Sequence, residues 1–237
     1  MMAAGVSGRV LRDALEPLDD GLWRWSARHP EWHPRTEFGA EVVSWALRED
    51  GGTVLIDPLL PEEEDGGGEA FAEALDAIVK GEVTIVVTIP YHVRSAEPLA
   101  RRYSAAVHGH RDVARRFEGA VDFHPIEPGQ TFAHGMTGHR IGSPPRKELP
   151  LHVPGRRALA FGDAVVGVGD GLRVWVQRPH DERRERWYRE RLVPTLEPLL
   201  ELDVEQVLTT HGPPVLRDGG AALRDALAAP PWHHRPT

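Results

Sequence analysis

The segment Leu208-Thr209-Thr210-His211-Gly212-Pro213-Pro214 decides the fold of this chain. An extended stretch here runs directly into a histidine that is flanked by glycine and proline. Glycine at such a point allows a close backbone approach or an unusual dihedral angle, and polar residues at strand ends are where α/β folds place their sites. Taken alone, a histidine before Gly-Pro-Pro is more often a loop residue than a ligand, so its meaning depends on the rest of the chain.

Three other segments have the same form, in which an extended stretch ends in a histidine or aspartate beside glycine or proline. They are Val54-Leu55-Ile56-Asp57-Pro58, Thr137-Gly138-His139-Arg140-Ile141-Gly142-Ser143 and Ala160-Phe161-Gly162-Asp163. Two imidazoles and a carboxylate are good ligands for a borderline divalent metal. The chain contains 13 histidines and no cysteine, which excludes disulfides, a cysteine nucleophile and every thiolate metal site. Any metal must therefore be held by imidazole and carboxylate groups.

The order and spacing of these segments resemble the metallo-β-lactamase fold superfamily, whose members are mostly zinc- or iron-dependent hydrolases. The resemblance extends roughly from residue 41 to residue 215. Residues 41–61 look like the opening hairpin of the family, which ends in a buried aspartate, here Asp57. The resemblance implies an α/β fold, an αββα sandwich of two mixed β-sheets flanked by helices.

Three later segments carry the ligands that the resemblance implies. Residues 137–143 look like the family's G-H-x-x-G-S segment, and residues 209–215 look like its G-H-G-P-P segment; each supplies one ligand histidine. Residues 161–163 look like the F-x-G-D segment, whose aspartate bridges two metals in the family. The metal ligands implied in this way are His139, Asp163 and His211.

The family's T-H-x-H-x-D-H motif, which supplies up to four ligands after the first central strand, is replaced in this chain. The loop after the predicted strand reads Thr88-Ile89-Pro90-Tyr91-His92-Val93-Arg94. Aligned on its threonine, the loop places Ile89, Tyr91, Val93 and Arg94 at the four ligand positions, and His92 falls one place off. Isoleucine, valine and arginine do not bind metals, and tyrosine is an unusual ligand. We therefore expect at most one metal, with His92 as a further candidate ligand.

Two arrangements of the site remain open at this stage. In the first, one divalent metal is retained, with zinc favoured. In the second, no metal is bound and Arg94 lies near Asp163 as a fixed guanidinium that neutralises the carboxylate. The candidate catalytic residues are Asp163, Tyr91, His92 and Arg94. Of these, Tyr91 and His92 also suit acid–base chemistry without a metal.

The expected function is that of a divergent hydrolase with an incomplete metal centre, acting on an ester-, lactone- or phosphoester-like small molecule. The alternative is a non-catalytic, metal-free member of the fold that serves as a binding or scaffolding module. Resemblance at the level of the fold does not decide between them, because the family includes lactamases, thioester and lactone hydrolases, nucleases and oxidoreductases.

Length and charge set the remaining expectations. The 237 residues predict one domain, with a Trp-rich N-terminal extension over residues 1–40 and a tail over residues 230–237. The net charge of −8 disfavours nucleic acid as a partner. We expect no membrane association, because no run approaches the roughly 18 apolar residues of a membrane span. No signal peptide is evident, so the expected location is the cytoplasm.

Periodicity and composition predict the strands and helices, and the surfaces that have a structural rather than a chemical role. The expected strands are 22–25, 43–47, 53–57, 83–88, 105–108, 121–123, 131–133, 138–141, 157–161, 172–177 and 206–209, and the expected helices are 69–80, one from 95, 111–118 and 181–192. Pro194 and Pro198 are expected to break or kink the last helix. Its arginines, interleaved with glutamates, are interpreted as a solvated face. Trp23, Trp25 and Trp32 are interpreted as a packing plug or a homodimer contact.

Overall fold

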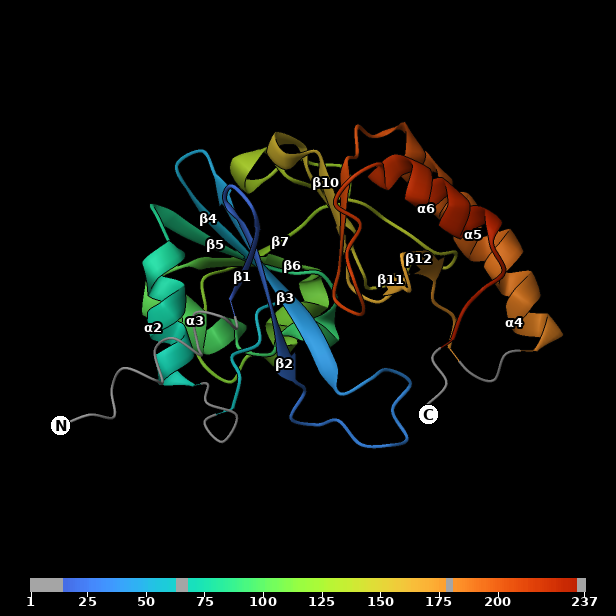
Figure 1. Cartoon of the computed structure of the whole chain (residues 1–237). Helices are drawn as coiled ribbons and strands as arrows, with labels where there is room; N and C mark the ends of the chain where they lie inside the picture. The colour runs from blue at the N-terminus through green and yellow to red at the C-terminus, as the bar shows by residue number, and fades with distance from the viewer. Residues whose placement is uncertain (1–14, 63–67, 178–180, 234–237) are drawn as a thin grey trace.

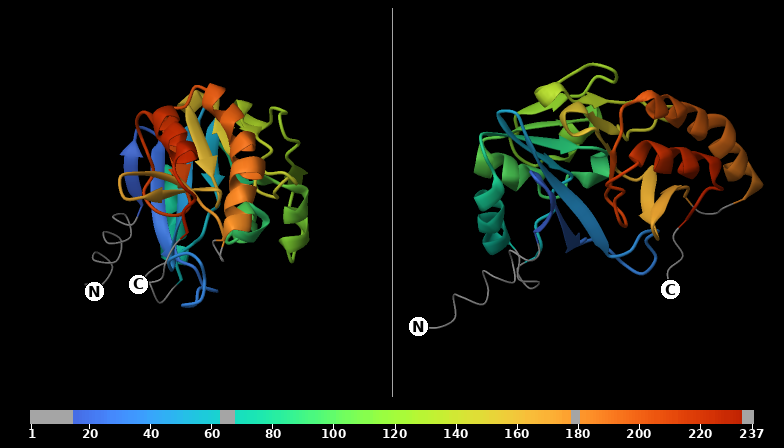
Figure 2. Two further views of the ribbon diagram at one scale, coloured as in Figure 1. Left: turned by 90° about the vertical axis from the view of Figure 1, so that its right-hand side faces the viewer. Right: turned by 45° about the horizontal axis from the view of Figure 1, so that its top comes forward.

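Two β-sheets pack face to face between two groups of helices (Figure 1). The computed structural model describes residues 15–62, 68–177 and 181–233. The helices on the outer side of the first sheet are α2 (Glu69–Ile78) and α3 (Ala96–Tyr103). Those on the outer side of the second are α4 (Glu182–Trp187), α5 (Val193–Leu196) and α6 (Gly219–Ala228). This arrangement persists in the other views (Figure 2) and confirms the expected αββα fold class.

The first sheet contains seven strands in chain order. They are β1 (Glu16–Asp19), β2 (Leu22–Arg28), β3 (Glu41–Glu49), β4 (Gly52–Ile56), β5 (Glu82–Val87), β6 (Ala106–Gly109) and β7 (Phe123–Pro125). Strands β1 to β4 pair antiparallel, and β4 to β7 pair parallel. Every residue of β5 after Glu82 is buried, as expected for a β-branched strand covered on both faces.

The second sheet has the order β13-β10-β9-β8, and a hairpin lies beside it. Its strands are β8 (Thr137–Gly138), β9 (Leu151–Val153), β10 (Ala158–Phe161) and β13 (Gln206–Thr209), and the hairpin is formed by β11 (Val165–Val168) and β12 (Gly171–Val174). Strands β1, β9 and β11 were not predicted. The predicted strand 131–133 is reduced to an isolated bridge between Thr131 and Thr137.

The helices differ from their predicted bounds near glycine and proline. α2 ends at Ile78, two residues before the predicted Lys80. The predicted helix 111–118 is a 3-10 helix over Arg111–Arg116. After α4 the chain continues without a break through a wider turn (Tyr188–Leu192), α5 and a 3-10 turn (Glu197–Glu201). Pro194 and Pro198 each lie in the first turn of a new segment, where their missing N–H groups break no helical hydrogen bond.

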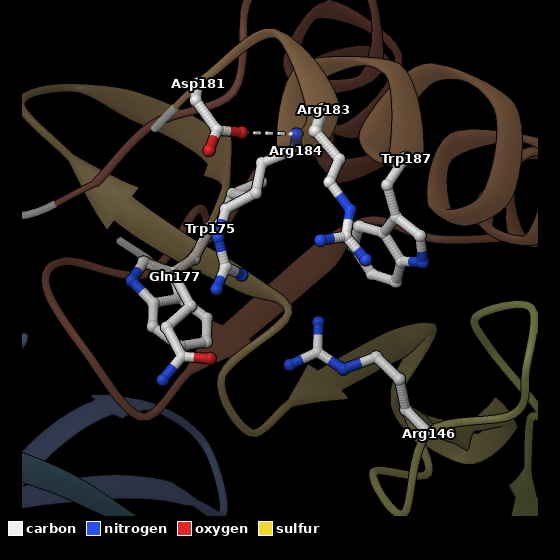
Figure 3. A pocket seen from close by; sticks show the side chains of 8 residues that line it. Arg146, Trp175, Gln177, Asp181, Arg183, Arg184 and Trp187 are labelled. Atoms are coloured by element: carbon white, nitrogen blue, oxygen red, sulfur yellow. Dashed lines mark hydrogen bonds between the residues drawn. The ribbon is translucent and has the colours of Figure 1, made fainter. Parts of the chain in front are cut away.

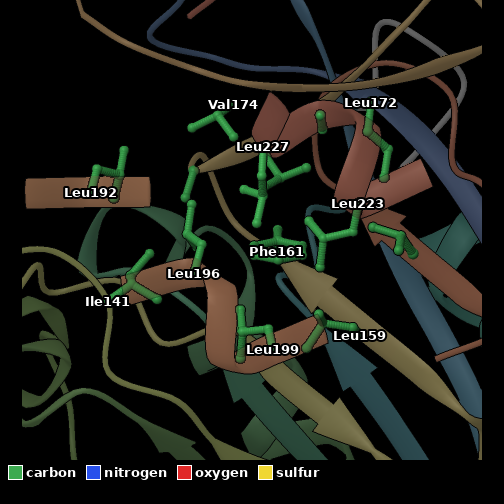
Figure 4. Packing of buried hydrophobic residues seen from close by; sticks show 14 of the residues in the cluster. Ile141, Leu159, Phe161, Leu172, Val174, Leu192, Leu196, Leu199, Leu223 and Leu227 are labelled. Carbon is green, nitrogen blue, oxygen red and sulfur yellow. The ribbon is translucent and has the colours of Figure 1, made fainter. Parts of the chain in front are cut away.

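Apolar clusters hold the layers together. Trp45 and Ile56 from the first sheet pack against Leu151 and Leu208 from the second, and all four side chains are fully buried. On the outer side of the second sheet, Phe161 packs among leucines of the C-terminal helices (Figure 4). The strands between these clusters are therefore fixed on both faces, which makes their ends a rigid frame for a site.

The register of the parallel strands places four segment ends side by side in two pairs. Phe161 of β10 pairs with Thr209 of β13, so Asp163 and His211 each follow two residues after a paired position. Ile56 of β4 likewise pairs with Val86 of β5, which brings Asp57 and the loop after β5 together. Strand pairing thus places Asp163 beside His211, and Asp57 beside the loop after β5.

The Trp-rich N-terminal segment contributes to the first sheet as β1 and β2. Trp25 is buried against Phe71, and its indole N–H donates to the carbonyl of Leu59 at 2.7 Å. At the other end, the backbone of Trp232 pairs with Val174 and Val176 beside β12, and the rest of the predicted tail, 234–237, lies outside the described residues. Among the described residues, no helix has the length and apolar character needed to cross a membrane.

Candidate functional site

Three side chains from different segment ends meet in one cluster: His92, Asp163 and His211. One potential ligand atom of each lies within 4.8 Å of the others. The Nε2 atoms of His92 and His211 each lie 3.3 Å from Oδ1 of Asp163. A tetrahedral ion with bonds of about 2.1 Å separates its ligands by about 3.4 Å, so this spacing suits one metal ion.

The bonding state of Asp163 supports this fit. Its Oδ1 atom is buried, makes no hydrogen bond of good geometry within the described residues, and faces the Nε2 atoms of His92 and His211. Buried carboxylate oxygens are nearly always hydrogen-bonded or bound to a cation. This oxygen and the two imidazole nitrogens that face it form the kind of donor set that binds a borderline divalent ion such as zinc.

Asp57 orients His92 toward the cluster. Its fully buried carboxylate accepts hydrogen bonds from the backbone N–H of Thr88 (2.8 Å), from the Thr88 hydroxyl (2.5 Å) and from Nδ1 of His92 (2.9 Å). A carboxylate only accepts, so Nδ1 carries a hydrogen, and in the neutral imidazole the lone pair of Nε2 is directed at Asp163. This carboxylate–histidine arrangement is the usual support of a metal-binding imidazole.

The electrostatics of the cluster are those of a buried acid between two bases. Although burial opposes ionisation, His92 and His211 hold the pKa of Asp163 well below its usual range. Burial and Arg94 oppose protonation of His92, but the carboxylates of Asp163 and Asp57 raise its pKa. For His211, burial prevails over Asp163 and lowers the pKa. Asp163 is therefore a buried anion, which favours a cation beside it.

A tight backbone contact and a stacked ring fix His211. Gly212 has a φ of 75°, and a Cβ atom there would lie 2.0 Å from the carbonyl oxygen of Gly167. The ring of Phe38 stacks on the imidazole at a centroid distance of 3.9 Å and an angle of 7°. The hydroxyl of Thr210 donates to the carbonyl of Gly162 at 2.6 Å, which ties the His211 segment to the Asp163 segment.

Arg94 lies at the cluster but does not form the expected pair with Asp163. Its Nη1 donates to the carbonyl oxygens of Asp57 (2.9 Å) and Val43 (3.2 Å). Within the described residues, no ion pair joins Arg94 to Asp163 at 4.0 Å or less, and both the Nε and Nη2 atoms of Arg94 are buried without a partner. The guanidinium is thus held by backbone carbonyls, and the backbone of Arg94 has a positive φ of 43°.

The cluster opens into a cleft of about 240 Å³. Tyr91 stands at its mouth with 65 % of its surface exposed, and the guanidinium of Arg116 lies over its ring at 5.1 Å. The loop between β2 and β3, including Trp32 and Phe38, also lines the cleft. The sequence analysis missed this role of the loop, because aromatic residues there look the same as packing residues.

His139 does not belong to the cluster, contrary to what the resemblance implied. Its ring lies 6.3 Å from that of His152, and burial and His152 lower its pKa. It follows β8, and its backbone N–H donates to the carbonyl oxygen of Pro150. The chain therefore does not run on directly toward β10. The place near Asp163 on this side is taken by a later residue of the same loop, Glu148.

Glu148 is a buried acid that the sequence analysis missed. Its Oε1 atom accepts hydrogen bonds from the backbone N–H groups of Gly162 (3.1 Å) and Ala164 (2.9 Å), on either side of Asp163. The side chain is fully buried, and its Oε2 atom has no partner among the described residues beyond Arg146 at 4.0 Å. Glu148 therefore fixes the backbone that presents Asp163.

Replacing Glu148 with glutamine is expected to remove a pH-dependent loss of stability. Burial raises the pKa of Glu148 from 4.5 to about 7. The folded protein holds this proton more tightly than the unfolded chain, so the contribution is full below pH 4.5 and is lost as the pH rises to about 7, a change of about 3 kcal/mol. Glutamine keeps the accepting oxygen for both backbone N–H groups.

Urea unfolding of both proteins across this pH range measures the effect. The stability of E148Q relative to the parent protein should grow as the pH rises through the folded-state pKa. Parallel stability curves would show that Glu148 is ionised equally in the folded and unfolded states.

Comparisons with known proteins add to this geometry. No protein-family model matches the chain, and no curated protein matches it. A metallo-beta-lactamase family protein from Thermus thermophilus has a similar structure, with 16 % sequence identity and a TM-score of 0.55 over 90 % of this chain and 80 % of that one. A metallo-beta-lactamase from Pontibacter korlensis has 17 % identity and a TM-score of 0.58, over 90 % and 96 %.

A metal-soaked flavodiiron core from Synechocystis sp. PCC6803 is also similar, with 14 % identity and a TM-score of 0.60, over 90 % of this chain and 59 % of that one. At such low identity the likeness concerns the fold and not the activity. The two packed sheets, the flanking helices and these structural neighbours lead to one assignment: the chain has the metallo-β-lactamase fold.

Proposed function

We propose that this chain is a hydrolase that holds one divalent metal ion on His92, Asp163 and His211 and cleaves an ester-, lactone- or phosphoester-like small molecule. The observation that carries the proposal is the buried Oδ1 of Asp163, which lies 3.3 Å from two imidazole nitrogens and makes no hydrogen bond of good geometry within the described residues. A metal ion bound there supplies Lewis-acid polarisation of a carbonyl or phosphoryl oxygen.

The chain's own residues supply the remaining functions. The Asp57 carboxylate accepts a hydrogen bond from Nδ1–H of His92 and thereby fixes the direction of Nε2. Phe38 covers one face of His211 and shields it from water. Tyr91, an exposed residue that lines the cleft, is the candidate to donate a proton to a leaving group. Three protein ligands leave a coordination position free, as in catalytic rather than structural zinc sites.

A specific observation favours the runner-up, a metal-free binding module. Arg94 places a guanidinium beside the cluster, where its charge opposes protonation of His92. Because both are positively charged, the guanidinium and a metal ion compete for the negative charge of Asp57 and Asp163. In this version the cleft binds a small anionic ligand without turning it over.

Metal analysis of the protein purified without a His-tag decides between the two. We expect about one zinc, iron or manganese ion per chain, together with hydrolysis of a generic ester, lactone or phosphodiester that is lost in Asp163→Ala. Asp170→Ala is the matched control, because Asp170 is an exposed carboxylate in the β11–β12 turn. A metal-free protein, or activity that survives Asp163→Ala, would overturn the proposal.

A further inference from the structure

A second cavity, about 530 Å³ in volume, lies next to the start of α4. None of the described side chains that line it belongs to the metal cluster. Its size falls within the range of about 300–1,000 Å³ that is usual for small-molecule sites. Its polar and aromatic lining comes from three parts of the chain: Arg146, Trp175, Gln177, Arg183, Arg184 and Trp187.

Three guanidinium groups point into this cavity from different directions (Figure 3). Arg183 and Arg184 reach in from α4, and Arg146 reaches in from the loop between β8 and β9. In the described part of the chain, the one carboxylate in the lining is Asp181, whose Oδ1 accepts from the backbone N–H of Arg184 at 2.8 Å. The cavity therefore has a positive excess that an anion can balance.

Two indole rings form the apolar surface of the same cavity. Trp175 and Trp187 both line it, and the guanidinium of Arg146 lies 5.9 Å from the ring centre of Trp175. Half-buried indoles next to guanidinium groups offer flat faces for stacking. Trp175 also contacts Phe38 at a ring distance of 4.7 Å, and Phe38 stacks on His211. This aromatic wall separates the cavity from the metal cluster.

The arrangement differs from the interpretation of 181–192 as a purely solvated face. Arg189 fits that interpretation, because it pairs with Glu185 one turn earlier at 3.0 Å. Arg183 and Arg184 instead line the cavity, since they lie on the side of α4 that carries Trp187. The pattern of alternating charge does not show which arginines have acidic neighbours and which face a cavity.

We propose that this cavity binds a small molecule that carries a flat apolar ring and an oxyanion, either a phosphate or a carboxylate. Planar guanidinium groups bind both oxyanions through paired N–H donors, and the indoles bind the ring. The proposal is independent of metal binding and of hydrolysis at the cluster.

Isothermal titration calorimetry with four probes tests the proposal on the 237-residue chain. 1-Naphthyl phosphate and 1-naphthoate carry both features with different oxyanions, 1-naphthol carries the ring alone, and inorganic phosphate carries the anion alone. We expect one of the first two to bind at least about tenfold more tightly than 1-naphthol and phosphate. Which of the two binds more tightly identifies the oxyanion.

Matched arginine variants locate the binding site. The double variant Arg183→Gln/Arg184→Gln should weaken the preferred probe about tenfold or more, and Arg146→Gln should weaken it from the other side of the cavity. Arg186→Gln is the control, because Arg186 is exposed on α4 and does not line the cavity. Equal affinity for 1-naphthol, no binding of either naphthyl anion, or equal effects of the double variant and Arg186→Gln would overturn the proposal.

Discussion

His92→Ala is expected to weaken metal binding by at least about 100-fold, whereas His139→Ala is expected to leave it unchanged. His92 presents Nε2 to Asp163 at 3.3 Å and is held in that orientation by Asp57. His139 lies beside His152 and outside the cluster. The two variants therefore distinguish the ligand set of the structure from the one that the sequence motifs imply.

The measurement is metal content after dialysis, followed by zinc titration against a competing chelator. His211→Ala serves as the positive control, because both ligand sets include His211. Circular dichroism of each variant shows that loss of metal is not loss of fold. A protein that keeps its metal in His92→Ala and loses it in His139→Ala would reverse the assignment.

The difference between the two ligand sets shows what the sequence can specify. Asp163 and His211, both expected as ligands from the motifs, lie together in the structure because each follows a strand and those strands pair in parallel register. Such placement depends only on strand order and on short extensions beyond the strand ends. The fold could be predicted from the sequence for the same reason, because it too depends on the order of the strands and on the residues at their ends.

Placement inside an irregular loop is not specified in this way. His92 falls one place off the family's spacing, yet it faces the cluster because Pro90–His92 forms a 3-10 turn, in which successive side chains point about 120° apart. His139 misses the cluster because the chain after β8 forms an irregular loop that ends only where β9 begins at Leu151. Neither path leaves a periodic signal.

The surroundings of the cluster depend on contacts between distant segments. Phe38 reaches His211 across the sandwich, and Arg94 finds its acceptors in β3 and after β4. Aromatic and arginine residues suit surfaces, cores and sites equally well, so their role becomes visible only when the fold is known.

Gly212→Ala is expected to lower both the stability of the protein and its metal affinity, although glycine has no side chain to bind metal. The new Cβ atom would lie 2.0 Å from the carbonyl oxygen of Gly167, and the φ of 75° is itself unfavourable for alanine. Relief of the contact must move the backbone next to His211. We expect a loss of about 2–5 kcal/mol in the free energy of unfolding and at least about tenfold weaker zinc binding.

Gly169→Ala is the matched control for the backbone effect alone. Gly169 also has a positive φ, 62°, but a Cβ atom there meets nothing within 4 Å, so its cost is limited to about 1–2 kcal/mol. Gly167→Ala tests the contact from the opposite side, because its Cβ atom would lie 1.9 Å from the carbonyl oxygen of Pro213. Equal stability losses in Gly212→Ala and Gly169→Ala, with metal affinity intact, would contradict the close approach. Matching losses of metal affinity in Gly212→Ala and Gly167→Ala instead mean that the contact between the two backbones holds His211 in place.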